Sequence, residues 1–355
     1  RRRVLSRIHH PLGAGVLIVV GPTGVGKTRL KEEIINYCIS QQKDSLDKDP
    51  GRIAIACVDV KPRLDGKFSW GELFETALFS LNEPMINQKI IFDNDGNILS
   101  SSRKREAGNV LRASFENALK YRKPAAFIFD EAQHIVDASK DETITRYLDV
   151  FKSIADASGV PLILLGNFGL AKSLVLNGQL IRRSDVLYYP PYSDTREDLA
   201  HFRNAVDQLK KLLPIEEVFA FEENWDFLFE RSLGCIGILK HWLVKAVALA
   251  IEAKSKKLSL KHLQLTALTK KEAEILQKEI NGGEEKVKVF VDDNHFQRKI
   301  IQELDSERKK ELGKSGAKGN RPGQRNPSID VVDTKESDIN KIGIELGAPA
   351  AMQNM

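Results

Sequence analysis

Short apolar runs alternate with amphipathic stretches along the first half of the chain. Unbroken apolar runs are typical of parallel strands covered on both faces, whereas a strand with one solvated face alternates apolar and polar residues. The runs predict strands at Gly15–Val20, Arg52–Val60, Ala125–Phe129, Pro161–Leu165 and Asp185–Tyr189. We therefore predict a three-layer α/β core over residues 13–192, built on a parallel five-stranded sheet.

Between the second and third of these strands, polar residues mark the ends of further elements. Ser69-Trp70-Gly71-Glu72 is a capping box, in which Ser and Glu satisfy free backbone groups at the start of a helix. Asp95-Gly96 interrupts the apolar segment Ile90–Leu99 and is typical of a hairpin turn. A further helix is expected after the hairpin, with Val110 and Phe115 on its inner face.

The pattern changes after Tyr192. Thr195–Leu213 and several segments within Trp225–Ile280 have helical periodicity and no further strand is expected, which predicts an all-helical lid over residues 193–282. From residue 283 the chain becomes polar, so residues 283–355 are predicted to be a flexible tail that can serve as a partner-binding segment. Residues 1–12 are a basic N-terminal segment.

Composition narrows the class of protein without indicating an activity. The 355 residues are 42% hydrophobic and 29% charged, an ordinary globular balance. No stretch of eighteen apolar residues exists, so we expect no membrane span and no membrane partner. Cys38, Cys57 and Cys235 are isolated, which favours reduced thiols in a cytoplasmic protein and argues against zinc. The net charge of +5 is compatible with a polyanionic partner.

A phosphate-binding loop follows the first predicted strand. Gly21-Pro22-Thr23-Gly24-Val25-Gly26-Lys27-Thr28 fits the pattern G-x-x-x-x-G-K-[ST] without a mismatch. Its glycines let backbone N–H groups approach phosphate oxygens, and the helix N-terminus adds the positive end of its dipole. Lys27 is predicted to reach the β- and γ-phosphates of ATP, and the Thr28 hydroxyl to ligate Mg²⁺. We include Arg29, which follows the loop, in the predicted nucleotide site.

Polar residues also end the third and fourth predicted strands. Asp130 is predicted to lie near Mg²⁺ and to hold it through water, while Glu131 orients and deprotonates the water that attacks the γ-phosphate. Asn167 can hydrogen-bond that water or the γ-phosphate. The alternative for Asn167 is a purely structural role as the cap of the following turn.

Basic residues complete the predicted catalytic set. Arg182 and Arg183 precede the fifth strand, where one arginine can project into the nucleotide site of a neighbouring subunit. The alternative is a solvated basic pair. Lys240, near the start of a lid helix, can fold back onto the phosphates and couple the lid to nucleotide state, although an exposed helix lysine is an equally simple interpretation.

These elements, in this order, resemble those of an AAA+ ATPase, an α/β P-loop core followed by a helical lid. The segment Tyr189–Ser193 is similar to the one that follows the last core strand in origin-recognition-type AAA+ proteins. Further segments resemble the TnsC/TniB family of transposition regulators, relatives of MuB. They are Val58–Arg63, Asp65–Trp70, Leu81–Pro84, Asp130–His134 and Gly234–Leu239. The resemblance covers about residues 10–280; Lys240 departs from it, because many AAA+ proteins carry arginine there.

The resemblance implies an ATP-dependent homo-oligomer, a ring or helical filament, on double-stranded DNA of any sequence. Such an assembly links a target-selection protein to transposase subunits in bacteria, and ATP hydrolysis disassembles it. Family members contact DNA from the region between the second and third strands. The matching basic residues, suited to phosphate contacts, are Lys61, Arg63, Lys67, Arg103, Lys104 and Arg105.

Three other functions compete with this one. A replication initiator or helicase loader of the same fold predicts a DNA-reading domain after the lid, where this sequence is polar. A helicase needs a second α/β domain, and residues 193–355 offer no strands for one. A nucleotide-gated signalling protein would not bind DNA at all.

Overall fold

The computed structural model describes residues 4, 5, 8, 15–62, 68–92, 98–101, 107–137, 141–170, 184–215, 217, 218 and 220–288. Strands and helices alternate up to residue 188, and helices predominate after it. No single helix in these ranges is long and apolar enough to cross a membrane. Two consecutive helices, α10 (Trp225–Ser232) and α11 (Ile236–Glu252), pass that test only as a pair bent by 109°.

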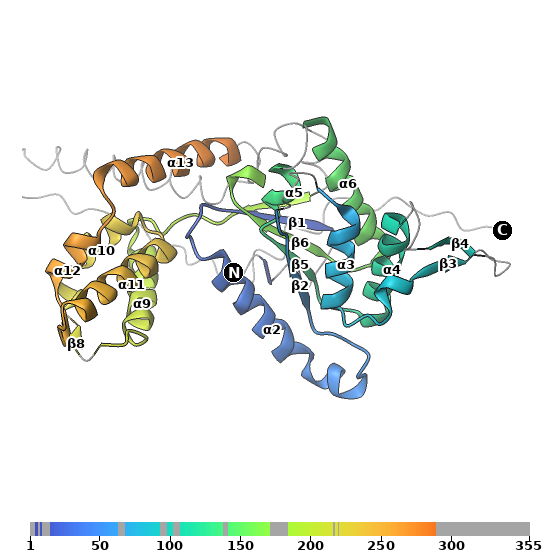
Figure 1. The fold of residues 1–355 in the computed structure, drawn as a ribbon, viewed down its shortest axis with the longest axis horizontal. Helices are drawn as coiled ribbons and strands as arrows, with labels where there is room; N and C mark the ends of the chain where they lie inside the picture. The colour runs from blue at the N-terminus through green and yellow to red at the C-terminus, as the bar shows by residue number, and fades with distance from the viewer. Residues whose placement is uncertain are drawn as a thin grey trace, which may run out of the picture. The chain divides into compact units, whose positions relative to one another are not determined.

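A parallel sheet of five strands forms the core, as the apolar runs predict (Figure 1). Its strands are β1 (Val16–Val20), β2 (Ala56–Asp59), β5 (Phe127–Asp130), β6 (Leu162–Gly166) and β7 (Ser184–Tyr188). They lie in the order β2-β5-β6-β1-β7. A strand was expected to begin at Arg52, but β2 begins four residues later. The Ile53 N–H donates to the carbonyl of Arg122, at the end of a helix, and so it does not bond a neighbouring strand. The order places β6 between β5, which ends in Asp130, and β1, which leads into the phosphate-binding loop.

Helices cover both faces of this sheet, which confirms the predicted three layers. On one face lies α2 (Lys27–Lys48), whose Leu30, Ile34 and Cys38 pack against alternate residues of β1, β5 and β6. On the other face lie α3 (Trp70–Ser80), α4 (Ala107–Arg122), α5 (Gln133–Asp137) and α6 (Asp141–Ser158). The strands are apolar throughout because the side chains on both faces of the sheet are buried.

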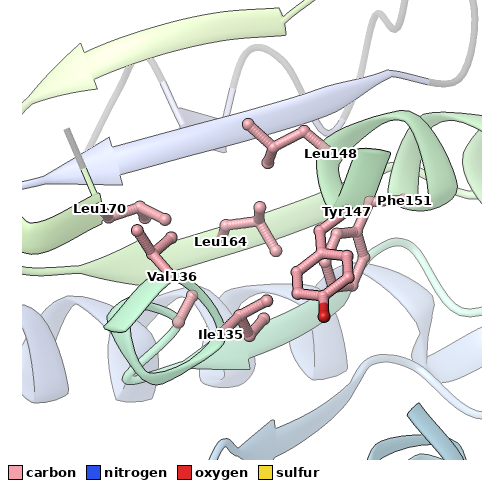
Figure 2. A pocket seen from close by; sticks show the side chains of 8 residues that line it. Ile135, Val136, Tyr147, Leu148, Phe151, Leu164 and Leu170 are labelled. Atoms are coloured by element: carbon pink, nitrogen blue, oxygen red, sulfur yellow. The ribbon is translucent and has the colours of Figure 1, made fainter. Parts of the chain in front are cut away.

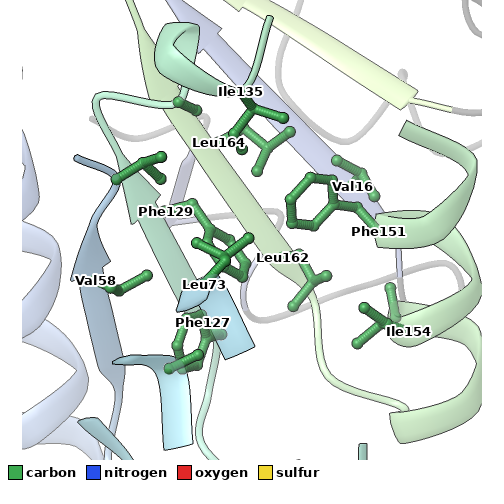
Figure 3. Packing of buried hydrophobic residues seen from close by; sticks show 14 of the residues in the cluster. Val16, Val58, Leu73, Phe127, Phe129, Ile135, Phe151, Ile154, Leu162 and Leu164 are labelled. Carbon is green, nitrogen blue, oxygen red and sulfur yellow. The ribbon is translucent and has the colours of Figure 1, made fainter. Parts of the chain in front are cut away.

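Aromatic side chains fill the second face. Phe129 is fully buried, and its ring centroid lies 4.9 Å from those of both Phe127 and Phe151 (Figure 3). Burying one such side chain stabilises the fold by about 1.5–3 kcal/mol. This packing holds β5 firmly, and it thereby fixes the acidic residues at the strand's end.

The segment between β2 and β5 also has the expected elements. α3 begins after Ser69, whose hydroxyl accepts the Glu72 N–H at 3.3 Å. A short 3-10 helix, η1 (Ile86–Gln88), leads to the antiparallel hairpin of β3 (Ile90–Phe92) and β4 (Ile98–Ser101). The predicted turn, Asp95-Gly96, lies outside the described residues.

A second hydrophobic core unites most of the described helices after β7. They are α9 (Arg196–Lys210), η2 (Phe221–Glu223), α10 (Trp225–Ser232), α11 (Ile236–Glu252) and α12 (Leu260–Thr266). Trp242 of α11 is buried, and its indole N–H donates to the carbonyl of Leu263 in α12 at 2.9 Å. The prediction of no strands in this region was wrong in one detail, since β8 (Glu217–Val218) pairs with β9 (Lys257–Leu258).

The predicted boundary at residue 283 was also wrong. α13 (Lys270–Lys288) continues through Gly282 and Gly283 without a break. Ile280, Gly283 and Val287 are buried on one face of this helix, and Val287 belongs to the core cluster of the sheet. The glycines do not end the helix because its packing against the core outweighs their unfavourable helix propensity of about 1 kcal/mol each.

Candidate nucleotide site

The loop between β1 and α2 folds as a phosphate cradle. Gly24 and Gly26 have φ angles of 80° and 108°, a backbone conformation that favours glycine. The Lys27 ammonium donates to the carbonyls of Gly21 and Pro22, both at 2.9 Å. Burial lowers the pKa of Lys27, although the nearby Glu131 and Asp130 carboxylates oppose this shift. A partly buried ammonium held by neutral carbonyls is a favourable partner for an anion such as phosphate.

The acidic end of β5 lies beside this loop. Asp130 is only 4% exposed, and its carboxylate pairs with Lys31 of α2 at 2.7 Å. Lys31 also pairs with Asp59, at the end of β2, at 2.8 Å. Burial lowers the pKa of Lys31, but the hydrogen bonds to Asp130 and Asp59 outweigh this and the net shift is upward.

Asp130 and Thr28 fit the role of magnesium ligands. The described residues contain no group of three or more His, Cys, Asp or Glu side chains that could hold a metal. Mg²⁺ characteristically takes one or two protein oxygens and completes its shell with water and phosphate. One carboxylate and one hydroxyl beside a phosphate loop match that donor set. To ligate the ion, Asp130 has to share its carboxylate with Lys31.

Glu131 occupies a left-handed backbone conformation, with a φ of 54°. Its backbone N–H donates to the Asp130 carboxylate at 2.9 Å, and its exposed side chain accepts a hydrogen bond from the Gln133 amide. Left-handed conformations are costly outside glycine, by about 1–2 kcal/mol, and persist where surrounding contacts impose them. The turn thus holds the side chain of Glu131 at the tip of β5.

Asn167 follows β6 directly. Its side-chain oxygen accepts the Gly169 N–H at 2.8 Å, so it does cap the following turn, as the structural alternative expects. Its backbone N–H donates to Gln133 at 3.2 Å. The cap uses only the oxygen of the amide; a contact of the amide nitrogen with phosphate or water stays a prediction.

The helical region touches the loop directly. The N–H of Gly237, in the first turn of α11, donates to the Gly24 carbonyl at 2.7 Å. Cys235 is the residue that precedes this helix, and it makes no side-chain hydrogen bond to the helix end. Burial raises the pKa of its thiol to about 12, although the nearby Lys27 opposes this shift. Lys240 is exposed on α11, and its role in nucleotide binding stays a prediction.

The C-terminal helix α13 also lies at this edge of the sheet. The Tyr188 hydroxyl, at the end of β7, donates to the Glu284 carboxylate at 2.7 Å. Burial and this hydrogen bond raise the pKa of Tyr188. Gly283 lies so close to Phe168, the residue after Asn167, that a Cβ on it would be 2.2 Å from the ring. Sequence analysis assigned this segment to a tail and therefore missed the contact.

The remaining predicted site residues are placed in part. Arg29 is exposed on α2 and pairs with Glu32 and Glu33, at 3.2 and 3.5 Å, so its place in the nucleotide site stays a prediction. Lys61 is exposed just after β2. The others, predicted as arginine fingers or DNA contacts, lie outside the described residues: Arg63, Lys67, Arg103, Lys104, Arg105, Arg182 and Arg183.

Lys31, Gln133 and Gly237 are the site residues that sequence analysis missed. Lys31 lies one helical turn after Lys27, a spacing that could have placed both on one face of α2. Gln133 and Gly237 lie in two of the segments that carry the family resemblance, Asp130–His134 and Gly234–Leu239, but the sequence gave them no role, because Asn167 and Gly24, which they bond, belong to distant segments of the chain.

A small apolar pocket lies behind α5, between α6 and β6, and it is not part of this site (Figure 2). Its lining has no polar surface. The residues that line it are Ala132, Ile135, Val136, Tyr147, Leu148, Phe151, Leu164 and Leu170. An apolar cavity of this kind stays dry and does not attract a nucleotide.

Comparison with known proteins agrees with this fold. Residues 9–174 match the family model described as an AAA domain. The fold is that of an AAA+ P-loop ATPase, a parallel five-stranded sheet with surrounding helices and a helical region after it. No curated protein matched the sequence.

Among solved structures, the chain is similar to the ORC2 protein of Aeropyrum pernix. The identity is 15% and the TM-score 0.49, over 76% of this chain and 66% of that one. It is also similar to the ORC1 protein of the same organism in complex with DNA, with 13% identity and a TM-score of 0.46 over 75% and 63%. A third similar structure is domain III of the Thermotoga maritima replication initiation protein DnaA. The identity is 16% and the TM-score 0.45, over 75% of this chain and 88% of that one. The chain thus spans less than two thirds of the length of each ORC protein, and likenesses this low say nothing of its substrate.

Proposed function

We propose that this chain is an ATP-hydrolysing regulator of DNA transposition, of the TnsC/TniB kind, that assembles on double-stranded DNA when ATP is bound. The observation that carries the ATPase activity is that Lys27, Asn167 and the pair Asp130-Glu131 follow or end β1, β6 and β5, three neighbouring strands in that order, with both carboxylates near enough to oppose the lowering of the Lys27 pKa by burial. An ammonium for the phosphates, a carboxylate for magnesium and a second carboxylate for water are the groups that phosphoryl transfer to water requires.

Each residue has one role in the proposed reaction. Lys27 exchanges the carbonyls of Gly21 and Pro22 for the β- and γ-phosphates. Asp130 and Thr28 hold Mg²⁺, which neutralises phosphate charge when bound. Glu131 accepts a proton from the attacking water, and Asn167 orients that water.

A second copy of the chain completes the site. Arg182 or Arg183 of a neighbouring copy enters the nucleotide site and stabilises the charge that develops on the transferred phosphoryl group. Hydrolysis therefore depends on assembly, and it dissolves the assembly by removing the γ-phosphate that joins two copies.

DNA binding rests on the basic residues between β2 and β5. Lys61 is exposed at the end of β2, as a phosphate contact requires. Together with Arg63, Lys67 and Arg103-Lys104-Arg105 it would give sequence-independent, salt-sensitive binding. On DNA, the assembly presents a surface to a target-selection protein and to transposase subunits, which the chain after α13 helps to recruit.

Two variants test the ATP switch. Glu131→Gln keeps the shape of the side chain but not its basicity, so it should bind ATP normally, lose hydrolysis by about 100-fold or more, and remain assembled on DNA. Lys27→Ala should lose ATP binding and with it assembly. Electron microscopy and gel shifts on plasmid DNA, with and without a non-hydrolysable ATP analogue, give the readout. Normal turnover by Glu131→Gln, or unchanged filaments of Lys27→Ala, would contradict the proposal.

A triple replacement tests the DNA-binding surface. Changing Arg103, Lys104 and Arg105 to Gln should weaken DNA binding for every sequence and reduce its salt dependence by about one to three ion equivalents. The matched control changes Lys254, Lys256 and Lys257, which are exposed in the helical region, to Gln. Equal loss in both triple variants would mean that net charge alone attracts DNA. No loss in the first would favour a signalling ATPase that binds no DNA.

A further inference from the structure

Gln133 connects the two strand ends that carry Glu131 and Asn167. Its amide nitrogen donates to the Glu131 carboxylate, and its amide oxygen accepts the Asn167 backbone N–H at 3.2 Å. Gln133 is only 4% exposed, which is unusual for a glutamine and is explained by hydrogen bonds at both ends of its amide.

The surrounding backbone leaves little freedom for this side chain. A Cβ on Gly166, the last residue of β6, would lie 3.0 Å from the Gln133 oxygen. The N–H of Ala132 donates to the carbonyl of Leu165 at 2.8 Å, so the turn after β5 is itself bonded to β6. The amide of Gln133 is therefore held between the two strand ends.

The order of the strands shows toward which neighbour Gln133 holds the Glu131 carboxylate. β6 lies between β5 and β1, and the phosphate-binding loop follows β1. The hydrogen bond to Gln133 therefore ties the Glu131 carboxylate toward β6, the side of β5 on which β1 and its loop lie, and not toward β2 on the other side. The general base needs this orientation, because it has to reach a water placed against the γ-phosphate.

We propose that Gln133 is a positioning residue for ATP hydrolysis, which orients the Glu131 carboxylate by anchoring it to the backbone at Asn167. This inference rests on the proposed ATPase activity and adds a residue to it. In this role Gln133 acts through Glu131, with which it shares a hydrogen bond.

Two replacements test the hydrogen bonds at the two ends of the Gln133 amide separately. Gln133→Glu keeps an oxygen that can accept the Asn167 N–H but loses the donor to Glu131. Gln133→Met has a similar length and supplies neither. Both should lower kcat by about 10-fold or more and leave the Kd for ATP within about twofold, because neither contacts the phosphates.

Val136→Ala is the matched control, since Val136 is buried one turn later on the same short helix and lines the apolar pocket. It should lower the melting temperature by about 3–6 °C without a change in kcat. If both Gln133 variants keep kcat within twofold, the inference is wrong. It is equally wrong if Val136→Ala loses kcat to the same extent, or if the Kd for ATP rises as much as kcat falls.

A second readout does not need hydrolysis. Amide hydrogen exchange at Asn167 should accelerate in Gln133→Met but not in Gln133→Glu or Val136→Ala, because only methionine removes the acceptor. If the wild-type protein hydrolyses no ATP with or without DNA, the proposed function fails. The exchange rates at Asn167 then still show whether Gln133 anchors the end of β6. Equal rates in all variants would overturn this anchoring.

Discussion

The backbone N–H of Gly237 donates to the carbonyl of Gly24 at 2.7 Å, which joins the first turn of α11 to the middle of the phosphate-binding loop. The two residues are in such close contact that a Cβ on Gly237 would lie 2.7 Å from that carbonyl oxygen and 2.8 Å from the Gly24 Cα. A backbone hydrogen bond therefore joins the helical region to the loop.

Replacing Gly237 with alanine should displace α11 from the loop. A backbone atom cannot turn aside as a side chain does, so either the loop or the helix has to shift, and we expect the Kd for ATP to rise by about 10-fold. Titration with a fluorescent ATP analogue measures this.

Gly71→Ala is the control for that change. Gly71 is the second residue of α3, as Gly237 is of α11, and a Cβ there would meet nothing closer than the Ser69 hydroxyl at 3.8 Å. Both variants have the same effect on helix propensity, which cancels in the comparison. Equal affinities in the two would show that the close contact does not shape the nucleotide site.

Cys235 offers a chemical probe of the same contact. Its thiol is fully buried and its pKa is raised to about 12, so at pH 8 very little of the reactive thiolate is present. In the native protein iodoacetamide should leave Cys235 unmodified while partly exposed Cys57 reacts slowly, as mass spectrometry can measure. Gly237→Ala should make Cys235 reactive, and rapid labelling of Cys235 in the wild type would contradict the burial of this helix end.

Lys31→Met should destabilise the protein by about 1–3 kcal/mol, because it leaves the buried Asp130 carboxylate without its cation. Urea denaturation measures the loss. The pKa of Lys31 is raised above 10.5, so its contribution is complete below that pH and disappears only as the pH rises through the higher value of the folded state. The difference from the wild type should therefore be constant from about pH 7 to 9.

Arg29→Met is the control on the same helix. Arg29 also pairs with carboxylates, but its side chain is 71% exposed, whereas that of Lys31 is 13% exposed. We expect a loss below about 0.5 kcal/mol, since water screens exposed ion pairs. A comparable loss in both variants would mean that burial is not what makes the Lys31 pair important.

Gly283→Leu should release α13 from the core. The side chain would overlap the ring of Phe168, and overpacking of this kind costs about 1–3 kcal/mol or more. Hydrogen exchange along residues 280–288 should accelerate, and the hydrogen bond between Tyr188 and Glu284 should be lost.

Gly282→Leu places the same side chain one residue earlier, where nothing lies within 4 Å of a Cβ. It should stabilise α13 by up to about 1 kcal/mol through helix propensity and leave its exchange unchanged. If the two leucine variants behave alike, α13 does not pack on Phe168 in solution.

The sequence alone predicted most of the core of this protein. β1, β5, β6 and β7 lie within two residues of the predicted strands, because an unbroken apolar run is a local signal that burial on both faces explains. The phosphate-binding loop could also be predicted from the sequence, since its glycines and Lys27 lie within eight consecutive residues.

What surrounds those elements depended on the tertiary structure. Two glycines in a polar segment indicated an end to the helical region, yet α13 continues through both because Gly283 meets Phe168. Tyr188 and Glu284 are 96 residues apart, and no periodicity connects them. Local patterns thus determined the strands and the phosphate-binding loop, whereas the partners of Lys31, Gln133 and Gly237 were decided only by packing. Those contacts form only where folding brings distant segments together in a region of low dielectric constant, which strengthens them, and a linear pattern does not record this.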